Sequence, residues 1–173
     1  MASRKANEEL RVSIDINPHY VCGLLGPLAL ATEMDSAGDV FNQIDYSNAS
    51  QRQLVIDFLI RPPFNGLEDA TAQQVKASLG YCVGLAHDFP SAVTEKLLLC
   101  GITESDARQF LAQLWSSLFS EELPANSNEI TYKVKSKPLR ANQFAYKRPE
   151  GKNWDEQIND FRRQMFDRLL ESR

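Results

Sequence analysis

Residues 91–119 constrain the fold more than any other stretch, because their apolar spacing predicts two consecutive helices. In the second helix, apolar side chains recur at steps of three and four residues and form one wide stripe: Ala107, Phe110, Leu111, Leu114, Trp115, Leu118 and Phe119. Gly101 is expected to end the first helix in a left-handed conformation, and Thr103 with Asp106 approximates a capping box for the second. Because water would penalise so wide an apolar stripe, we predict a core helical hairpin over residues 91–120.

The last amphipathic pattern, residues 153–171, predicts a C-terminal helix whose apolar stripe also needs a cover. The stripe consists of Trp154, Ile158, Phe161, Met165 and Leu169. We expect the core of the chain itself to cover most of this stripe, and we expect residues 1–8 to be disordered. A chain of 173 residues with 43% hydrophobic content is long enough for one good core, so a single domain, residues 1–173, is predicted.

Residues 53–60 fit two structures. Their β-branched side chains suit a buried strand, whereas Ser50 and Gln53 form a capping-box pair that favours a helix. The helix is the preferred interpretation. In either case, the pair Pro62-Pro63 is expected to end the element, because proline disfavours helical geometry in the residue before it.

Residues 68–86 carry another helical stripe, and Gly80 and Gly84 lie on a different side of the same predicted helix. Each glycine costs about 1 kcal/mol relative to alanine in a helix interior, so both positions need a structural reason. Close packing of a neighbouring helix, or a break in this helix, is the preferred explanation. Binding of a small molecule against the two glycines is an alternative that the sequence leaves open.

Two segments, residues 10–16 and residues 130–135, alternate between apolar and polar side chains with the period of a half-buried strand. Pro138 interrupts the second pattern, and residues 142–147 are a candidate for a third strand, which predicts a basic hairpin over residues 129–148. The predicted fold class is therefore α+β. We expect a mostly helical domain with a small antiparallel sheet, made by the N-terminal strand and the late hairpin.

The basic segment, residues 130–149, is the clearest electrostatic feature. The formal net charge is −4, yet this segment contains six basic residues and no acidic one, whereas residues 1–129 contain 8 basic and 17 acidic residues. The candidate binding residues for an anionic partner are Lys133, Lys135, Lys137, Arg140, Lys147 and Arg148. The preferred interpretation is a solvated strand edge or an intramolecular partner for the acidic remainder, and the alternatives are an acidic protein surface and nucleic acid. Tyr132 shares the parity of the apolar face, which is unlike a base-stacking platform.

No motif in the chain specifies an active site. The dinucleotide, phosphate-loop, nucleophile-elbow and zinc-protease signatures are all absent from the sequence. His19 with Cys22 and Cys82 with His87 are poor zinc candidates, since five residues place the second pair about 140° apart around a helix axis. No catalytic residue, metal ligand or cofactor is therefore predicted.

An odd number of cysteines within apolar patterns, and a polar start without an apolar leader, predict a cytoplasmic protein without a disulfide framework. No apolar run reaches the roughly 20 residues that span a membrane, so no membrane partner is expected. These observations favour a non-enzymatic interaction or regulatory protein that binds a protein partner. A nucleic-acid-binding protein that uses the basic segment is the alternative, and a small-molecule enzyme of unknown class is the third. A helix-turn-helix is disfavoured because Glu104 and Asp106 would face phosphate, and homo-oligomerisation is left open.

Overall fold

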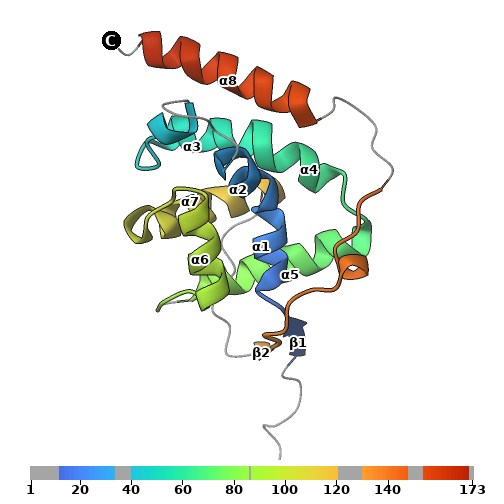
Figure 1. Ribbon diagram of the computed structural model, residues 1–173. Coiled ribbons are helices and arrows are strands. Elements are labelled where there is room, and N and C mark those ends of the chain that lie inside the picture. Colours follow the sequence, from blue (N-terminus) through green and yellow to red (C-terminus); the bar gives the residue numbers. More distant parts are fainter. Residues whose placement is uncertain (1–11, 34–39, 86, 121–129, 148–153, 172–173) are drawn as a thin grey trace, which may run out of the picture.

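Helices make up most of the computed structural model, which describes residues 12–33, 40–85, 87–120, 130–147 and 154–171 (Figure 1). The helices are α1 (His19–Leu24), α2 (Gly26–Glu33), α3 (Ala49–Val55), α4 (Arg61–Asn65), α5 (Asp69–Gly84), α6 (Ser91–Leu99), α7 (Glu104–Phe119) and α8 (Trp154–Glu171). The 3-10 turns are η1 (Val40–Gln43) and η3 (Ala141–Gln143), and a π-helix, η2 (Ile56–Ile60), joins α3 to α4. The strands are β1 (Val12–Ile16) and β2 (Ile130–Val134). The prediction of a mostly helical chain with a small sheet is confirmed.

The apolar core lies where the helices cross. Helix α1 packs on α5 and α6, α7 packs on α3 and α5, and α8 covers α3 and η2 at the end of the molecule opposite the strands (Figure 1). Fully buried side chains in this core include Leu25, Leu28, Ile56, Leu59, Leu79, Leu97, Phe110 and Leu111. Across the described ranges, no helix combines the length and the apolar character that a membrane-crossing segment requires.

The predicted helical hairpin is formed by α6 and α7. Gly101 has a φ of +78°, and the Ile102 N–H donates to the Leu97 carbonyl at 2.9 Å, which is the bonding pattern of a left-handed helix end. Thr103 is the N-cap of α7, but its hydroxyl donates to the Asp106 carboxylate instead of accepting from the backbone. The predicted start of the helix at Thr103 is therefore correct, but the capping-box hydrogen bonds are not formed.

The ambiguous residues 53–60 are helical. Asn48, rather than Ser50, caps α3, since its side chain accepts hydrogen bonds from two backbone N–H groups of the first turn. The prediction that Pro62-Pro63 ends the element is wrong. The π-helix η2 closes at Arg61, whose N–H donates to the Ile56 carbonyl, and α4 then begins afresh. Both prolines fall in the first turn of α4, where a missing N–H costs no helical bond.

Helix α5 contains the two glycines that required a reason. Gly80 is buried within an unbroken helix, and it lies beside Trp115 and Tyr132. Gly84 is the last helical residue, and Leu85 leaves the helix in an extended conformation. Gly80 therefore leaves space beside Trp115 and Tyr132, and Gly84 stands at the helix end.

The sheet is parallel, so the prediction of an antiparallel sheet is wrong. Val12 pairs with Ile130 and Ile16 pairs with Val134, in a two-stranded ribbon of β1 and β2. Alternation along a strand fixes which side chains share a face but does not fix the direction of the neighbouring strand. The ribbon lies at the end of the molecule opposite α8 (Figure 1).

The predicted hairpin over residues 129–148 is also wrong. Residues 142–147 do not pair with β2: they contain part of η3, and Tyr146 forms an isolated antiparallel bridge with Leu67. The backbone groups of this segment find partners near α4 and α5 instead, because the chain crosses the body after Pro138 rather than turning back along β2.

The C-terminal helix is present as predicted, and the body of the chain covers the three stripe residues whose side chains the structure describes. Ile158, Phe161 and Met165 are buried, and the Phe161 ring stacks on the Phe41 ring with centroids 5.2 Å apart. The predicted disorder of residues 1–8 concerns a segment outside the described residues.

Candidate functional site

Five of the six basic residues predicted to bind an anionic partner lie on the ribbon and on residues 135–147, which follow it and which we call the strap. Exposed side chains belong to the five that the structure describes: Lys133, Lys135, Lys137, Arg140 and Lys147. Arg148 lies outside the described residues. The basic segment is therefore presented at the surface, but its cations are divided between two kinds of structure.

Carboxylates of the chain itself hold two of these cations. The Nζ of Lys135 lies 2.8 Å from Oδ2 of Asp15 in β1, and the Nζ of Lys147 lies 2.7 Å from Oδ1 of Asp69 at the start of α5. The hydrogen bond and the charge of each lysine hold the pKa of its carboxylate partner below the ordinary value. Because both pairs are well exposed, they position the strap more than they stabilise the fold.

Lys133, Lys137 and Arg140 form no salt bridge with any other described residue, and we call them the free cations. Lys133 stands in register with Asp15, whose carboxylate already binds Lys135. Lys137 contributes its carbonyl oxygen to the fold, as an acceptor for the Asn17 side chain, while its ammonium group is exposed. These three positive charges are available to a ligand at the surface.

The two faces of the ribbon differ in chemistry because side chains alternate along each strand. Ile14 and Tyr132 lie on the inner face, toward α5, where the rings of Tyr132 and Tyr81 are 5.2 Å apart. Asp15 and Lys133 lie on the opposite, outer face. Tyr132 is therefore directed away from the cations, as its sequence parity predicted.

The outer edge of β2 has no hydrogen-bonding neighbour within the described part of the chain. The Lys135 N–H donates to the Ile16 carbonyl at 2.8 Å, so this residue directs its backbone toward β1. Successive residues of a strand direct their backbone groups to alternate edges, so those of Tyr132 and Val134 face away from β1. The side chain of Val134 is 48% exposed. Strand β2 thus offers unpaired donors and acceptors beside the free cations.

A hollow of about 260 Å³ lies under the inner face of the ribbon. Its lining includes Ile14, Lys76, Ala77, Gly80, Trp115 and Tyr132. The lining is mainly apolar, and Gly80 deepens it because glycine has no side chain. Sequence reasoning singled out this glycine but did not connect it with the ribbon, since no local signal brings α5 and β2 together.

Hydrogen bonds at several points hold the strap against the helices. The bonds are Asn17 Nδ2 to the Lys137 carbonyl at 2.9 Å, Ala145 N–H to Thr71 Oγ1 at 3.2 Å, Glu68 N–H to the Ala145 carbonyl at 3.0 Å, and Lys147 N–H to the Gly66 carbonyl at 2.7 Å. The Phe144 ring also packs directly on Gly23, where a Cβ atom would come within 2.5 Å of Cε2 of the ring. The strap therefore has a defined position, and the bond to Asn17 places Lys137 next to the end of the ribbon.

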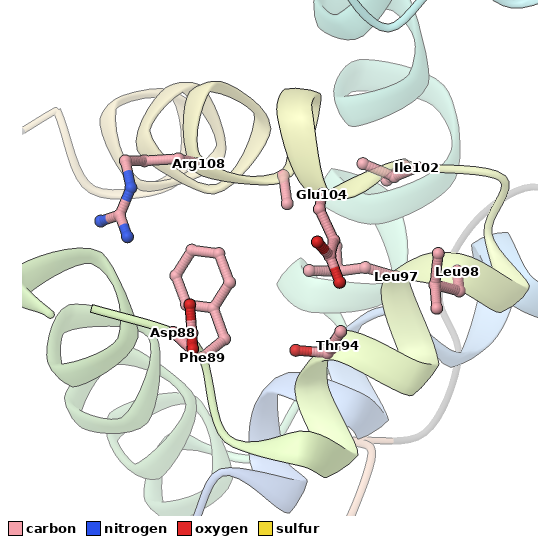
Figure 2. A pocket seen from close by; sticks show the side chains of 9 residues that line it. Asp88, Phe89, Thr94, Leu97, Leu98, Ile102, Glu104 and Arg108 are labelled. Atoms are coloured by element: carbon pink, nitrogen blue, oxygen red, sulfur yellow. The ribbon is translucent and has the colours of Figure 1, made fainter. Parts of the chain in front are cut away.

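A second hollow, of about 130 Å³, lies between α6 and α7 (Figure 2). Apolar side chains form much of its lining: Phe89, Leu97, Leu98, Ile102 and Ala107. Arg108 donates to the carbonyl oxygens of Leu85 and His87 at 2.6 and 3.0 Å, and its guanidinium lies 5.1 Å from the centroid of the Phe89 ring. Figure 2 shows the Glu104 carboxylate directed into the same space. Arg108 therefore connects the segment before α6 to α7.

The three thiols are poor nucleophiles, although Cys22 interacts electrostatically with both Cys82 and Cys100. Burial raises the pKa of Cys82 and of Cys100 to about 12, so both remain protonated and weakly nucleophilic at neutral pH. The Cys22 thiol is half-buried and donates to the Ala92 carbonyl. Among the described residues, no group of three or more His, Cys, Asp or Glu side chains is arranged to hold a metal ion.

Comparison of the chain with models of protein families, with curated proteins and with solved structures gives no match. The candidate site is therefore defined by its geometry: an open strand edge, an outer face with cations, and a hollow beneath the inner face.

Proposed function

We propose that this chain is a non-enzymatic protein-binding module, and that it binds an acidic segment of a partner protein at the ribbon. The observation that carries the proposal is the difference among the basic residues. Lys135 and Lys147 each form a salt bridge with a carboxylate of the chain, whereas Lys133, Lys137 and Arg140 form none with a described residue, although the charge of Lys133 also acts on Asp15. The three free cations match the charge of a partner's carboxylates.

A protein partner suits this surface better than nucleic acid does. Bases stack on exposed aromatic rings, but Tyr132 lies on the inner face. Three free cations would release few counterions, so phosphate binding by them alone would be weak at physiological salt. Nucleic acid remains the alternative that the experiment has to exclude.

Fluorescence anisotropy with three labelled probes tests the proposal. The probes are a peptide of alternating valine and glutamate, a single-stranded oligonucleotide and a duplex, each titrated with the full chain across a salt series. We expect the peptide to bind more tightly than either oligonucleotide at 150 mM salt. A shallow salt dependence is expected for the peptide, and a slope of about 0.7 to 0.9 log units per phosphate contact for the nucleic acids.

A pair of matched variants locates the site. Lys133→Gln combined with Lys137→Gln should weaken peptide binding about tenfold or more, since it removes two charge-assisted contacts. Arg163→Gln combined with Arg168→Gln changes the net charge equally on exposed positions of α8 and should change the affinity less than twofold. Equal loss in both variants, no peptide binding, or tighter binding of an oligonucleotide that the ribbon variant abolishes would overturn the proposal.

A further inference from the structure

We propose that the acidic segment binds in an extended conformation, as a third strand along the outer edge of β2. This inference rests on the proposed function and adds the way in which the partner is held. Three separate features of the ribbon carry it: the backbone at the edge, the charges on the outer face and the hollow under the inner face.

The backbone of β2 supplies the first feature. Tyr132 and Val134 direct their N–H and C=O groups to the edge that faces away from β1, where no described segment bonds to them. Such an edge is a template for another strand, because each added residue pair satisfies groups that otherwise bond only to water. A ribbon of two strands is also marginal by itself, so a third strand adds to its stability.

The outer face supplies the charge. An added strand places every second side chain beside Lys133, on the same face as Lys135 and Asp15. Opposite charges on neighbouring strands attract, so glutamate or aspartate is favoured at these positions. Lys137 and Arg140 follow on the strap and extend the positive charge beyond the end of β2.

The inner face supplies the apolar contact. The remaining side chains of the added strand would lie beside Tyr132 and Val134, near the hollow that Gly80 deepens. Burial of valine-sized side chains against the apolar part of the lining, Trp115 and Tyr132, is favourable, and Lys76, the cation of the lining, lies 5.3 Å from the centroid of the Phe119 ring. The chemistry of the ligand follows from both faces: an extended peptide that alternates acidic and apolar residues.

Backbone methylation of the valine–glutamate peptide tests the strand geometry without any change in the protein. Two peptides are made, one N-methylated at the valine amides and the other at the glutamate amides. In an added strand only one of the two sets points toward β2, so one peptide should bind about tenfold more weakly or worse. The other should stay within about threefold of the unmodified peptide, and polyglutamate of equal charge should bind more weakly than the alternating peptide.

The outcomes separate this inference from the proposed function. Equal affinity of both methylated peptides and the parent, with binding still lost in the Lys133 and Lys137 variant, would overturn strand addition and leave an electrostatic interaction. No binding of any peptide would overturn both. Sedimentation velocity adds a further check: a dimer that does not bind the peptide would mean that a second copy of the chain occupies the edge, against the proposal.

Discussion

Apolar side chains hold the helical body, α1–α8, together, whereas hydrogen bonds and exposed ion pairs do most to hold the strap. In the body Phe110 and Phe161 are completely buried, and the Phe110 ring packs edge-on against Tyr46 with centroids 5.8 Å apart. In the strap Phe144 is half-buried, and the basic residues around it are exposed. Burial of apolar surface stabilises the fold by about 25 cal/mol per Å², whatever the orientation of the contact. One hydrogen bond stabilises it by about 0.5–1.5 kcal/mol, and only when donor and acceptor are correctly placed.

The two regions should therefore respond differently to substitution. Loss of a buried side chain in the body leaves a cavity that the neighbours fill only in part. Loss of one strap contact leaves the others in place, so the strap is expected to loosen locally before the body unfolds. Four substitution experiments test this difference between body and strap, and they are given in order of decreasing expected effect.

Phe161→Ala should be the most damaging. It empties a fully buried site on α8 and removes the stacking on Phe41, so the free energy of unfolding should fall by about 3–5 kcal/mol. Phe166→Ala on the same helix is the control, since Phe166 is 57% exposed and should change it by less than about 1 kcal/mol. Urea denaturation followed by circular dichroism measures both. Small and equal changes in the free energy of unfolding for both variants would mean that α8 does not pack on the core.

Arg52→Met should come next. Arg52 is only 7% exposed, and its guanidinium donates to Gln113 Oε1 at 2.7 Å and to the Tyr46 carbonyl at 2.7 Å. Removal of these charge-assisted bonds leaves buried acceptors unpaired and should cost about 2–3 kcal/mol in the same urea assay. Arg61→Met is the control from the same helical run, because Arg61 pairs with Asp57 in a half-exposed ion pair and should cost about 1 kcal/mol or less. A larger loss of stability in the Arg61 variant than in the Arg52 variant would mean that burial does not decide how much these arginines stabilise the fold.

Gly23→Ala tests where the strap meets the body. The new Cβ would lie 2.5 Å from Cε2 of Phe144, so the ring must move, at an expected cost of about 1–2 kcal/mol. In a Phe144→Ala background the clash is gone, and the same substitution should be neutral or stabilise α1 by up to about 1 kcal/mol. Gly26→Ala, with nothing within 4 Å of its Cβ, should not depend on Phe144. Melting temperatures of the four Gly23 and Phe144 combinations decide the matter, and purely additive effects would mean that the strap does not pack on α1 in solution.

The strap's ion pairs should give the smallest effect, visible as a change in pH dependence. The carboxyls of Asp15 and Asp69 have lowered pKa values in the fold, whereas in the unfolded chain they titrate near about 3.9. Their stabilising contribution is therefore present above about pH 4 and is lost as the pH falls through the folded-state pKa. The double variant Lys135→Gln with Lys147→Gln should melt slightly below the wild type at pH 6, with the gap closing on acidification. A gap that is independent of pH would show that these lysines act by packing alone.

Much of the body follows from the sequence because each helix carries its own periodicity and its own end signals. Gly101 marks the end of α6, and the apolar spacing of α7 is enough to identify the buried residues Phe110 and Leu114. The π-helix escapes prediction, since no residue type specifies it and the prolines after it favour a simple stop. The bounds of α5 were predicted closely, but the partner of Gly80 was not.

The ribbon and the candidate site were predicted only in part. Charge patterning identified exposed cations, yet it could not tell the paired Lys135 from the free Lys133, because Asp15 lies more than a hundred residues earlier in the chain. The direction of β2 is likewise set by the path of the chain and not by alternation. The strap depends on Asn17 and Thr71, polar residues of types common on any surface, so no local pattern predicts its position. The single domain and the function stay predictions.

The parallel pairing of β1 with β2 also sets an order of events during synthesis. Val12 can pair with Ile130 only after the ribosome has added Ile130, about 120 residues later. At roughly 5–20 residues per second, this delay is on the order of ten seconds. Helices α1–α7 are all synthesised within this interval, whereas α8, which completes the core, follows β2. The first described strand to be made is thus paired only after the helices that separate it from its neighbour have been added. A pause in translation before Ile130 would leave the newborn chain with β1 unpartnered and able to pair with another strand in place of β2.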